Sequence, residues 1–336
     1  MNAPTAESGG AEPSGAEPSG ATPGGPRVRF RVGESEVGFR LDAALAGLAG
    51  VARSQARRWI DTGLVHLEGQ PARASARVTV GQTIEAQPPE PSPSDLAAEP
   101  IPLDVLHEDS DLIVVNKQAG LVVHPAPGHP SGTLVNALLH HCGDLAGIGG
   151  VLRPGIVHRL DKGTSGVMVV AKNDDTHAAL ASQFHDHDVE RVYLAIVRGV
   201  PGPDTGREDR PIGRHPRDRK RMSVATGSGR AAQTAWRVRE RFHGADHALL
   251  EVRPETGRTH QIRVHLASAG LPIAGDPVYG RSKPGRRAGV PLGLDRPALH
   301  AAVLGFRHPG SGVVVRFETE PPPDFAAAIE RLRAPR

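Results

Sequence analysis

The sequence predicts an α+β fold with a small N-terminal domain and a larger C-terminal one. Strand-like and helix-like segments are mixed without the regular βαβ alternation that is typical of a doubly wound sheet. The chain has 336 residues, which is enough for one large domain and a smaller one. A proline-rich stretch, PPEPSPSD at residues 88–95, is typical of a linker. We therefore place the domains at residues 27–88 and 99–336, joined by a linker at residues 89–98.

The N-terminal tail, residues 1–26, contains the short repeat AEPSGAEPSGATPGG. Pro, Gly and Ser bury too little apolar surface to offset the entropy that a chain loses on ordering. This tail is therefore predicted to be disordered.

The compartment follows from three absences in the sequence. The N-terminus has neither the basic nor the apolar region of a secretory signal. No run of about 18 apolar residues is present, so we expect no membrane partner. Cys142 is the only cysteine, which excludes an internal disulfide and fits a reducing cytoplasm.

Two helices and two strand segments are predicted in residues 27–88. VGFRLDAALAGLAG (37–50) has apolar residues close to helical spacing, and VARSQARRWIDTG (51–63) predicts a second helix. LVHLEGQPA then predicts a strand entering a turn, and ARVTVGQTIEAQ alternates like a second hairpin.

The second of these helices carries three arginines, Arg53, Arg57 and Arg58. They could meet RNA phosphates, or they could form the ordinary basic surface of a helix, and spacing alone leaves both open. RLD, SQARRWI, GLVHLEG and VTVGQTI follow one another within about residues 39–87. This order resembles an S4 domain, a small RNA-binding module, and the resemblance implies that the three arginines bind RNA.

Five strands and three helices are predicted in residues 99–336. LIVVNKQAGLVVHP (112–125) predicts a strand, a turn and another strand. The further strands are predicted at VYLAIVRG (192–199), HALLEVRP (247–254) and GVVVRFET (312–319), and the helices at TLVNALLHHC (133–142), DTHAALASQFHDH (175–187) and DFAAAIERLRA (324–334).

The basic residues gather in one segment of the larger domain. The formal net charge of +3 says little on its own, but residues 207–230 hold eight Arg or Lys against three acids. Such an excess could bind a polyanion, or it could be a solvated arginine-rich loop. The RNA contacts that we expect here come from Arg214, Arg219, Lys220 and Arg221.

One carboxylate stands out in IVHRLDKGTSGVMVVAK, residues 156–172. Asp161 lies between Arg159 and Lys162, and an apolar run follows it. A cation within a few ångströms would favour the ionised carboxylate. Such a group can serve as a nucleophile or as an electrostatic stabiliser. The plain alternative is a surface aspartate in a turn before a strand.

Three blocks resemble the signature of the pseudouridine synthases that modify uridines in large ribosomal and some transfer RNAs. HRLDKGTSGVMVVAK surrounds Asp161, ERVYLAIVRG places Tyr193 after it, and PETGRTHQIRVHLASAGLPIAGDPVYG (254–280) matches the third motif. The family implies an α+β catalytic domain with a mixed, mostly antiparallel sheet. RPIGRHPRDRKRMSV (210–224) and the S4 module are typical of the D-type subgroup, which acts on 23S ribosomal RNA.

The resemblance implies a role for individual residues. Asp161 matches the catalytic aspartate, which attacks the ribose or the base of a flipped-out uridine as the glycosidic bond breaks. Arg159 matches a residue that fills the space left by the flipped nucleotide. Tyr193 is expected to stack on the uracil while its hydroxyl assists proton removal at carbon 5, although a strand tyrosine could equally be plain core.

The third motif is expected to supply the partner of the aspartate. Arg258, in TGRTH, matches the basic residue that pairs with the catalytic carboxylate and holds it ionised. Arg263 lies close enough in sequence to be confused with it and stays the alternative. Ile262 is expected to form an apolar wall of the uracil pocket, or simply to lie in the core. His158 and Arg263 complete the substrate-binding residues that we expect.

No cofactor and no metal are expected, because the implied reaction is an isomerisation. The sequence contains no Walker A or GxGxxG motif. Histidines are frequent, but none falls into HExxH, and the pair in HQIRVH (260–265) is spaced wrongly for two ligands on one helix face.

The expected partner is RNA, in the form of 23S ribosomal RNA or a pre-50S particle, with no DNA partner, and we expect a monomer. Transfer RNA is the alternative substrate within the family. A second interpretation is a non-catalytic factor that binds RNA during ribosome assembly. Such a factor would be expected to lack active-site residues, whereas Asp161, Tyr193 and Arg258 are all present. A third interpretation is a nuclease or a metal hydrolase. It predicts that a chelator would abolish the activity.

Overall fold

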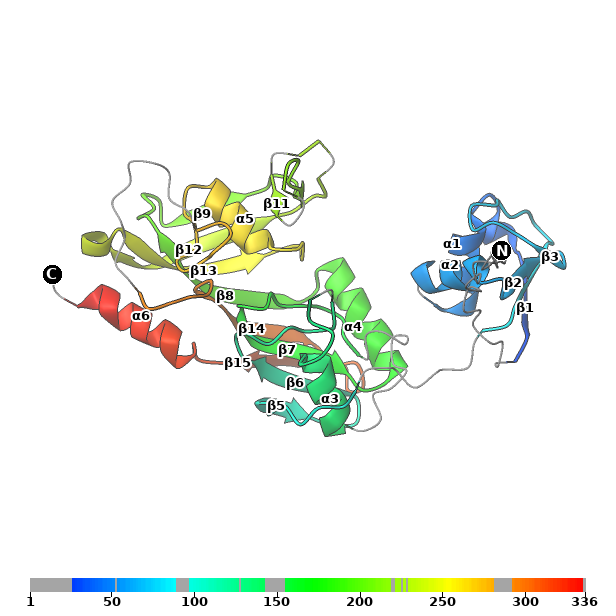
Figure 1. The fold of residues 1–336 in the computed structure, drawn as a ribbon, viewed down its shortest axis with the longest axis horizontal. Helices are drawn as coiled ribbons and strands as arrows, with labels where there is room; N and C mark the ends of the chain where they lie inside the picture. The colour runs from blue at the N-terminus through cyan, green and yellow to red at the C-terminus, as the bar shows by residue number, and fades with distance from the viewer. Residues whose placement is uncertain are drawn as a thin grey trace, which may run out of the picture. The chain divides into compact units, whose positions relative to one another are not determined.

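Figure 1 shows the chain in a computed structural model. The structure describes residues 26–334 except for 52, 89–96, 127, 143–154, 219–220, 225, 228 and 281–291, with the backbone alone at residue 54. The chain divides into two units, residues 1–92 and 93–336. Nearly all of the predicted disordered tail, and residues 89–96 of the predicted linker, lie outside the described residues.

The first unit is a small sheet covered by two helices. Its elements are β1 (Val28–Arg31), the 3-10 helix η1 (Glu34–Glu36), α1 (Leu41–Ala49), α2 (Arg53–Asp61), β2 (Val65–Leu67), β3 (Gln70–Pro71) and β4 (Thr83–Ala86). The strands pair in the order β1-β4-β2-β3. Leu41, Leu45, Trp59 and Ile84 are buried in one core that joins both helices to the sheet. The predicted second hairpin contributes only β4, because Arg77 makes a single bridge to Arg40.

The described part of the second unit contains a nine-stranded sheet in the order β5-β6-β7-β14-β8-β13-β12-β9, with β15 on β14. The strands are β5 (Val105–Glu108), β6 (Leu112–Lys117), β7 (Ser165–Ala171), β8 (Glu190–Arg198), β9 (Thr205–Glu208), β12 (Thr234–Phe242), β13 (His247–Pro254), β14 (Leu299–Arg307) and β15 (Val314–Glu318). Among these described strands, β7 with β14 is the one parallel pair. The predicted α+β class with a mixed, mostly antiparallel sheet is confirmed.

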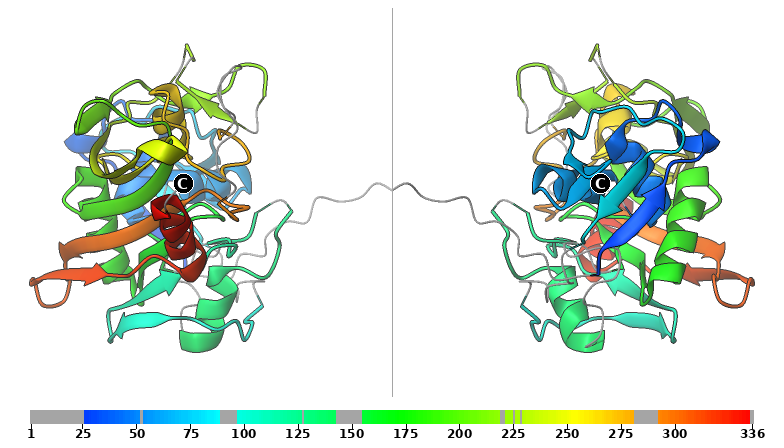
Figure 2. Two further views of the ribbon diagram at one scale, coloured as in Figure 1. Left: turned by 90° about the vertical axis from the view of Figure 1, so that its left-hand side faces the viewer. Right: turned by 90° about the vertical axis from the view of Figure 1, so that its right-hand side faces the viewer.

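The helices of the second unit pack on different parts of this sheet (Figure 1). They are α3 (Leu134–Cys142), α4 (Asp174–Asp186), the 3-10 helix η2 (His243–Ala245), α5 (Gln261–Ser268) and α6 (Pro323–Arg333). In Figure 1, α3 and α4 lie beside β6 and β7, and α5 lies beside β12 and β13. Figure 2 shows α6, in red, from the side of the C-terminus, where Phe325 packs with Leu299 and Ala195 in one core. None of the described helices is long and apolar enough to cross a membrane.

One detail of the strand prediction was wrong. The second strand expected within residues 112–125 does not form, since Val122 makes only a bridge to Thr133. Leu121 and Val123 instead pack into the core under α3. The two-stranded hairpin of β10 (Gly213–Arg214) and β11 (Met222–Ser223) stands apart from the main sheet and carries the basic segment.

Close contact between β7 and β14 fixes the start of β7, the strand that follows Asp161 in the chain. Gly166, paired with Ala301 across this contact, has a φ of 117°, and a Cβ there would lie 2.1 Å from the Ala301 carbonyl oxygen. Only glycine fits such a position. The start of β7, four residues after Asp161, is thus held against the centre of the sheet.

Candidate active site

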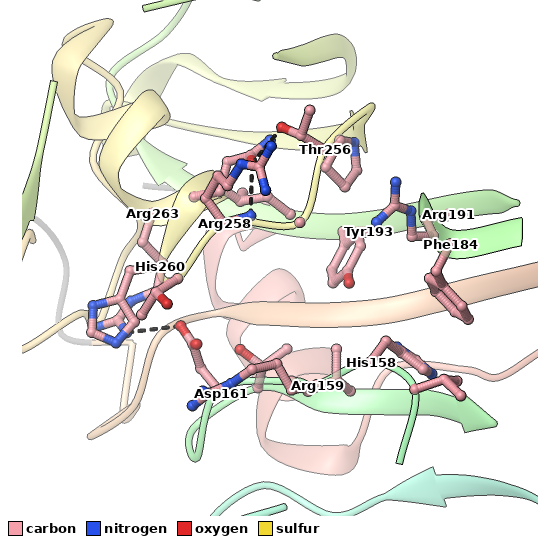
Figure 3. Close-up of a pocket in the computed structure, with 18 of the residues that line it drawn as sticks. His158, Arg159, Asp161, Phe184, Arg191, Tyr193, Thr256, Arg258, His260 and Arg263 are labelled. Atoms are coloured by element: carbon pink, nitrogen blue, oxygen red, sulfur yellow. Dashed lines mark hydrogen bonds and ion pairs between the residues drawn. The ribbon is translucent and has the colours of Figure 1, made fainter. Parts of the chain in front are cut away.

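A cavity of about 500 Å³ opens between the loop before β7, α4, β8 and the segment leading into α5. This size falls within the range of small-molecule sites, about 300–1,000 Å³. Figure 3 shows the side chains that line it, with Asp161 on one wall and Arg258, His260 and Arg263 on the facing one. The three sequence blocks that are far apart in the chain therefore meet at one site.

Backbone hydrogen bonds hold the loop that carries Asp161. The Thr164 N–H donates to the Asp161 carbonyl oxygen at 3.0 Å, which closes a turn. The Gly120 N–H donates to the carbonyl oxygen of Lys162 at 2.8 Å. The Asp161 side chain keeps 18% of its surface exposed. It is therefore sheltered but can be reached from the cavity.

Arg263, on the first turn of α5, makes the ion pair with Asp161. Its Nη1 donates to Asp161 Oδ2 at 2.9 Å, while Nε and Nη2 donate to the two oxygens of Asp276 at 2.7 and 2.9 Å. The Arg263 side chain is only 7% exposed, and that of Asp276 is fully buried. Burial alone would raise the pKa of Asp276, but the hydrogen bonds and charge of Arg263 outweigh it and lower this pKa. One buried guanidinium thus bridges two carboxylates.

The predicted pairing of Arg258 with Asp161 was wrong. The Arg258 Nε donates to the carbonyl oxygen of Ala231 at 3.1 Å, and its backbone N–H donates to Gln261 Oε1 at 3.0 Å. Arg258 lies in the turn before α5 begins at Gln261, so its side chain leaves the backbone in a different direction from that of Arg263. Arg258 still lines the cavity.

Tyr193 enters the cavity from β8, near the middle of the sheet. Its neighbours in the sheet are Val252 on β13 and Ala301 on β14. The ring packs against hydrophobic side chains, and Figure 3 shows it pointing into the cavity. Burial raises the pKa of Tyr193, so its hydroxyl stays neutral at physiological pH. Tyr193 is therefore packed against the hydrophobic core and also lines the cavity.

His158, Arg159 and Ile262 also line the cavity. Arg159 is exposed there, whereas Ile262 is 7% exposed and belongs to the main core as well. His158 is held as part of the wall, because its Nε2 accepts the Val169 N–H at 3.1 Å and its ring stacks on Phe184 at 4.4 Å. Burial, aided by the charge of a neighbouring arginine, lowers the pKa of His158 to about 3. It is thus a neutral ring whose Nε2 is already engaged.

Four of the residues predicted to contact RNA are exposed, three on α2 and one on β10. In α2, Arg53 donates to the buried Asp42 at 3.0 Å and Arg57 to Asp61 at 3.3 Å, while both arginines remain more than half exposed. Arg58 is exposed beside them, and Arg214 is exposed on β10. The Arg221 guanidinium lies 5.4 Å from the ring centre of Tyr279. Arg219 and Lys220 lie outside the described residues.

Lys117 was missed by the sequence reasoning. This lysine ends β6 with 1% of its surface exposed, and its Nζ donates to the carbonyl oxygens of Gln118 and Leu121, both at 2.9 Å. Burial lowers the pKa of Lys117 to about 7, opposed by the charge of Asp161 and reinforced by that of Arg296. The Lys117 ammonium therefore loses its proton near neutral pH, and it lies close enough to Asp161 to interact with its charge. The available signal in the sequence was the polar NK at the end of an apolar strand.

Potential metal ligands gather outside the cavity in two places among the described residues. In the first, Nε2 of His107 and Nε2 of His308 lie 2.8 and 2.9 Å from Asp109 Oδ2. His308 Nδ1 accepts the N–H groups of Gly310 and Ser311, so its Nε2 carries the proton that it donates to Asp109. That nitrogen has no lone pair for a metal. The second group consists of Glu108, His141 and Cys142. One oxygen of its Glu108 carboxylate already binds the ammonium group of Lys172 at 2.9 Å.

The second unit presents one paired carboxylate to a nucleoside-sized cavity, and the chain also carries a separate small domain. This combination points to an enzyme acting on a nucleic acid. The sequence model of the family described as RNA pseudouridylate synthase matches residues 111–268, and that of the S4 domain matches residues 39–84. This chain belongs to the RNA pseudouridine synthases, as its motifs predicted.

Relatives in several bacteria resemble the chain over almost its full length. An uncharacterized RNA pseudouridine synthase of Bacillus subtilis is 47% identical over 301 residues, which cover 89% of this chain and 96% of the relative. Ribosomal large subunit pseudouridine synthase D of Zymomonas mobilis is 46% identical over 313 residues, which cover 91% of this chain and 98% of the relative. The solved structure of human RNA pseudouridylate synthase domain containing 4 is 29% identical, with a TM-score of 0.54, over 68% of this chain and 93% of that one.

Proposed function

We propose that this enzyme isomerises specific uridines of 23S ribosomal RNA to pseudouridine, with Asp161 as the nucleophile. The observation that carries the proposal is the sheltered Asp161 carboxylate, which faces a cavity of nucleoside size and is paired with Arg263 at 2.9 Å. The full-length similarity to a protein named as a ribosomal large subunit pseudouridine synthase supports the choice of RNA.

The chemistry begins with access to the base. A uridine in a stack or a pair cannot reach Asp161, so it must be flipped out at a cost of about a few kcal/mol. The exposed Arg159 at the rim fills the gap that it leaves. Single-stranded loops are the favoured targets, because their bases extrude easily.

The isomerisation itself exchanges one bond to the ribose for another. Asp161 attacks the ribose or the base as the bond between C1′ and N1 breaks, and its charge stabilises the oxocarbenium-like C1′. The uracil turns within the cavity and carbon 5 bonds to C1′, while the bond to Asp161 breaks and releases the carboxylate. The proton on carbon 5 leaves and N1 takes up a proton, so that the product is an isomer of uridine. The neutral Tyr193 ring stacks on the uracil during this turn, and its hydroxyl assists the proton removal.

The Tyr193→Phe variant tests that division of roles. The ring and its packing stay, so we expect RNA affinity and thermal stability to be kept while the rate of product formation falls about 10²- to 10⁴-fold, the usual effect of losing a general acid or base. Single-turnover formation of pseudouridine in a stem–loop RNA measures the rate. A variant with the wild-type rate would show that the hydroxyl takes no part.

RNA affinity would come from cations on both units. The arginines of α2 and those of β10–β11 meet phosphates, a contact that positions RNA without reading its sequence. Transfer RNA is the alternative substrate, because the same chemistry suits any extruded uridine. Recognition of one or the other depends on the shape of the RNA around it.

Pseudouridine mapping of total RNA from cells with and without the gene tests the substrate. We expect discrete signals in the large ribosomal RNA to disappear when the gene is removed, and to return with the wild-type gene. Losses confined to transfer RNA would replace the proposed substrate by the alternative one. Retention of every signal would contradict the proposed function itself.

A further inference from the structure

His260 has an unusual backbone at the edge of the cavity. It is the residue immediately before α5, with φ 55° and ψ 22°, and thus lies in the left-handed region although it is not glycine. That conformation is strained for a residue with a Cβ and persists where the surroundings enforce it, often at functional sites. Figure 3 shows its ring beside the head of Arg263, on the same side of Asp161.

The hydrogen bonds of Tyr279 determine which nitrogen of His260 carries the proton. The Met222 N–H donates to the Tyr279 hydroxyl oxygen at 2.8 Å, and the same oxygen lies 2.9 Å from His260 Nδ1. The acceptor within reach of the hydroxyl proton among the described residues is this Nδ1. Since Nδ1 accepts, the proton of the neutral ring is on Nε2.

The surroundings of His260 keep the ring neutral. Burial lowers the pKa of His260, and the cations Arg263 and Arg159 lower it further, while the carboxylates Asp161 and Asp276 oppose them. A neutral imidazole at this position offers one N–H donor to the cavity.

Tyr279 is itself held on both faces. Its ring centre lies 5.1 Å from the Arg263 guanidinium and 5.4 Å from that of Arg221, and its ring meets the His260 ring edge-on at 5.7 Å. The residue is 7% exposed and packs with Ile212 and Val264 under the β10–β11 hairpin. It thus joins the basic hairpin to the arginine that pairs with Asp161.

We propose that His260 donates its Nε2–H to a carbonyl oxygen of the extruded uracil, and that Tyr279 is the positioning residue that fixes this tautomer. The proposal rests on the function proposed above. A neutral donor suits a neutral carbonyl, whereas a phosphate would be met by the exposed cation Arg159, which also lines the cavity.

The first test observes the ring directly. In protein with ¹⁵N-labelled histidine, two-bond nitrogen–proton NMR spectra report the tautomer, and His260→Gln identifies the signal. We expect the Nε2–H form in the wild type. In Tyr279→Phe, which keeps the ring but loses the hydroxyl, we expect a mixture of tautomers and a higher His260 pKa. An unchanged tautomer and pKa in that variant would overturn the role of Tyr279.

The second test measures single-turnover rates and RNA affinity in four proteins: wild type, Tyr279→Phe, His260→Phe and His260→Gln. We expect His260→Phe to lower the rate about 10- to 100-fold, with thermal stability and RNA affinity kept. His260→Gln, which retains an N–H donor, should recover part of the rate. In Tyr279→Phe, the rate should also fall at acid pH, because the higher pKa of His260 in this variant allows the ring to become protonated. Equal rates in all four would contradict the proposal.

RNAs with 2-thiouridine or 4-thiouridine at the target identify the acceptor, because sulfur accepts hydrogen bonds weakly. One of them should slow the wild type and have no further effect on His260→Phe. If neither substitution interacts with His260, the residue does not contact a uracil carbonyl. A wild type that binds RNA without forming pseudouridine would refute the proposed function and the contact, while the NMR comparison would still decide the role of Tyr279.

Discussion

Asp161→Asn is expected to abolish pseudouridine formation while RNA binding persists. The amide keeps the shape of the side chain and can still accept a hydrogen bond from Arg263, but it is not a nucleophile. Loss of a residue that forms the covalent intermediate lowers turnover by about 10⁴-fold or more. Product by mass spectrometry and RNA affinity by filter binding, measured on the same RNA, check both parts.

The matched control is Asp175→Asn, an exposed carboxylate in the first turn of α4. This change removes the same charge outside the cavity, so the rate should stay at the wild-type level. Continued product formation by Asp161→Asn would refute the nucleophile. Loss of RNA binding together with activity would instead indicate a role in substrate affinity.

Arg263→Gln is expected to have the second-largest effect, on stability as well as on activity. It leaves the buried Asp276 without its cation and breaks the pair with Asp161. Removing one partner of a buried ion pair costs about 3–5 kcal/mol of unfolding free energy. Denaturant unfolding measures this loss, and single-turnover assays at low temperature measure the rate in the protein that remains folded.

Two further variants separate the direct role of Arg263 from a loss of fold. Arg263→Lys keeps the charge but loses the two-pronged contact with Asp276, so its stability should fall less while its rate remains low. Arg258→Gln removes no ion pair among the described residues, and its unfolding free energy should change by about 0.5 kcal/mol or less. If Arg263→Lys kept the full rate while Arg258→Gln was stable but inactive, Arg258 and not Arg263 would have the catalytic role.

The choice between these arginines shows where the sequence stops being informative. Both lie in one motif, five residues apart, and their chemistry is the same. Only the point at which α5 begins, Gln261, decides that Arg263 turns toward Asp161 while Arg258 turns toward the backbone of Ala231. Helix boundaries are the part of a fold that local patterns define least.

The elements of the sheet were predictable to different degrees. The strands β8 and β13, whose apolar residues form short runs, were found close to their observed ends. β14 was missed, because its sequence LHAAVLGFR lacks alternation, and it is buried along nearly its whole length. His260 could not have been singled out from its motif, since its importance lies in a backbone conformation and in a hydrogen bond to a tyrosine 19 residues later.

The double pairing of Arg263 has a consequence for the covalent intermediate. In the proposed mechanism, Asp161 becomes an ester when it bonds to the nucleotide, and it then ceases to be an anion. A guanidinium that had only this partner would then be a lone cation in a poorly solvated place, which would oppose the forward step. Because Asp276 remains on its other edge, the arginine keeps an anionic partner after the attack, and the charge of the group changes from −1 to 0. The nucleophile can thus gain and lose its substrate in each cycle while the buried arginine stays in place.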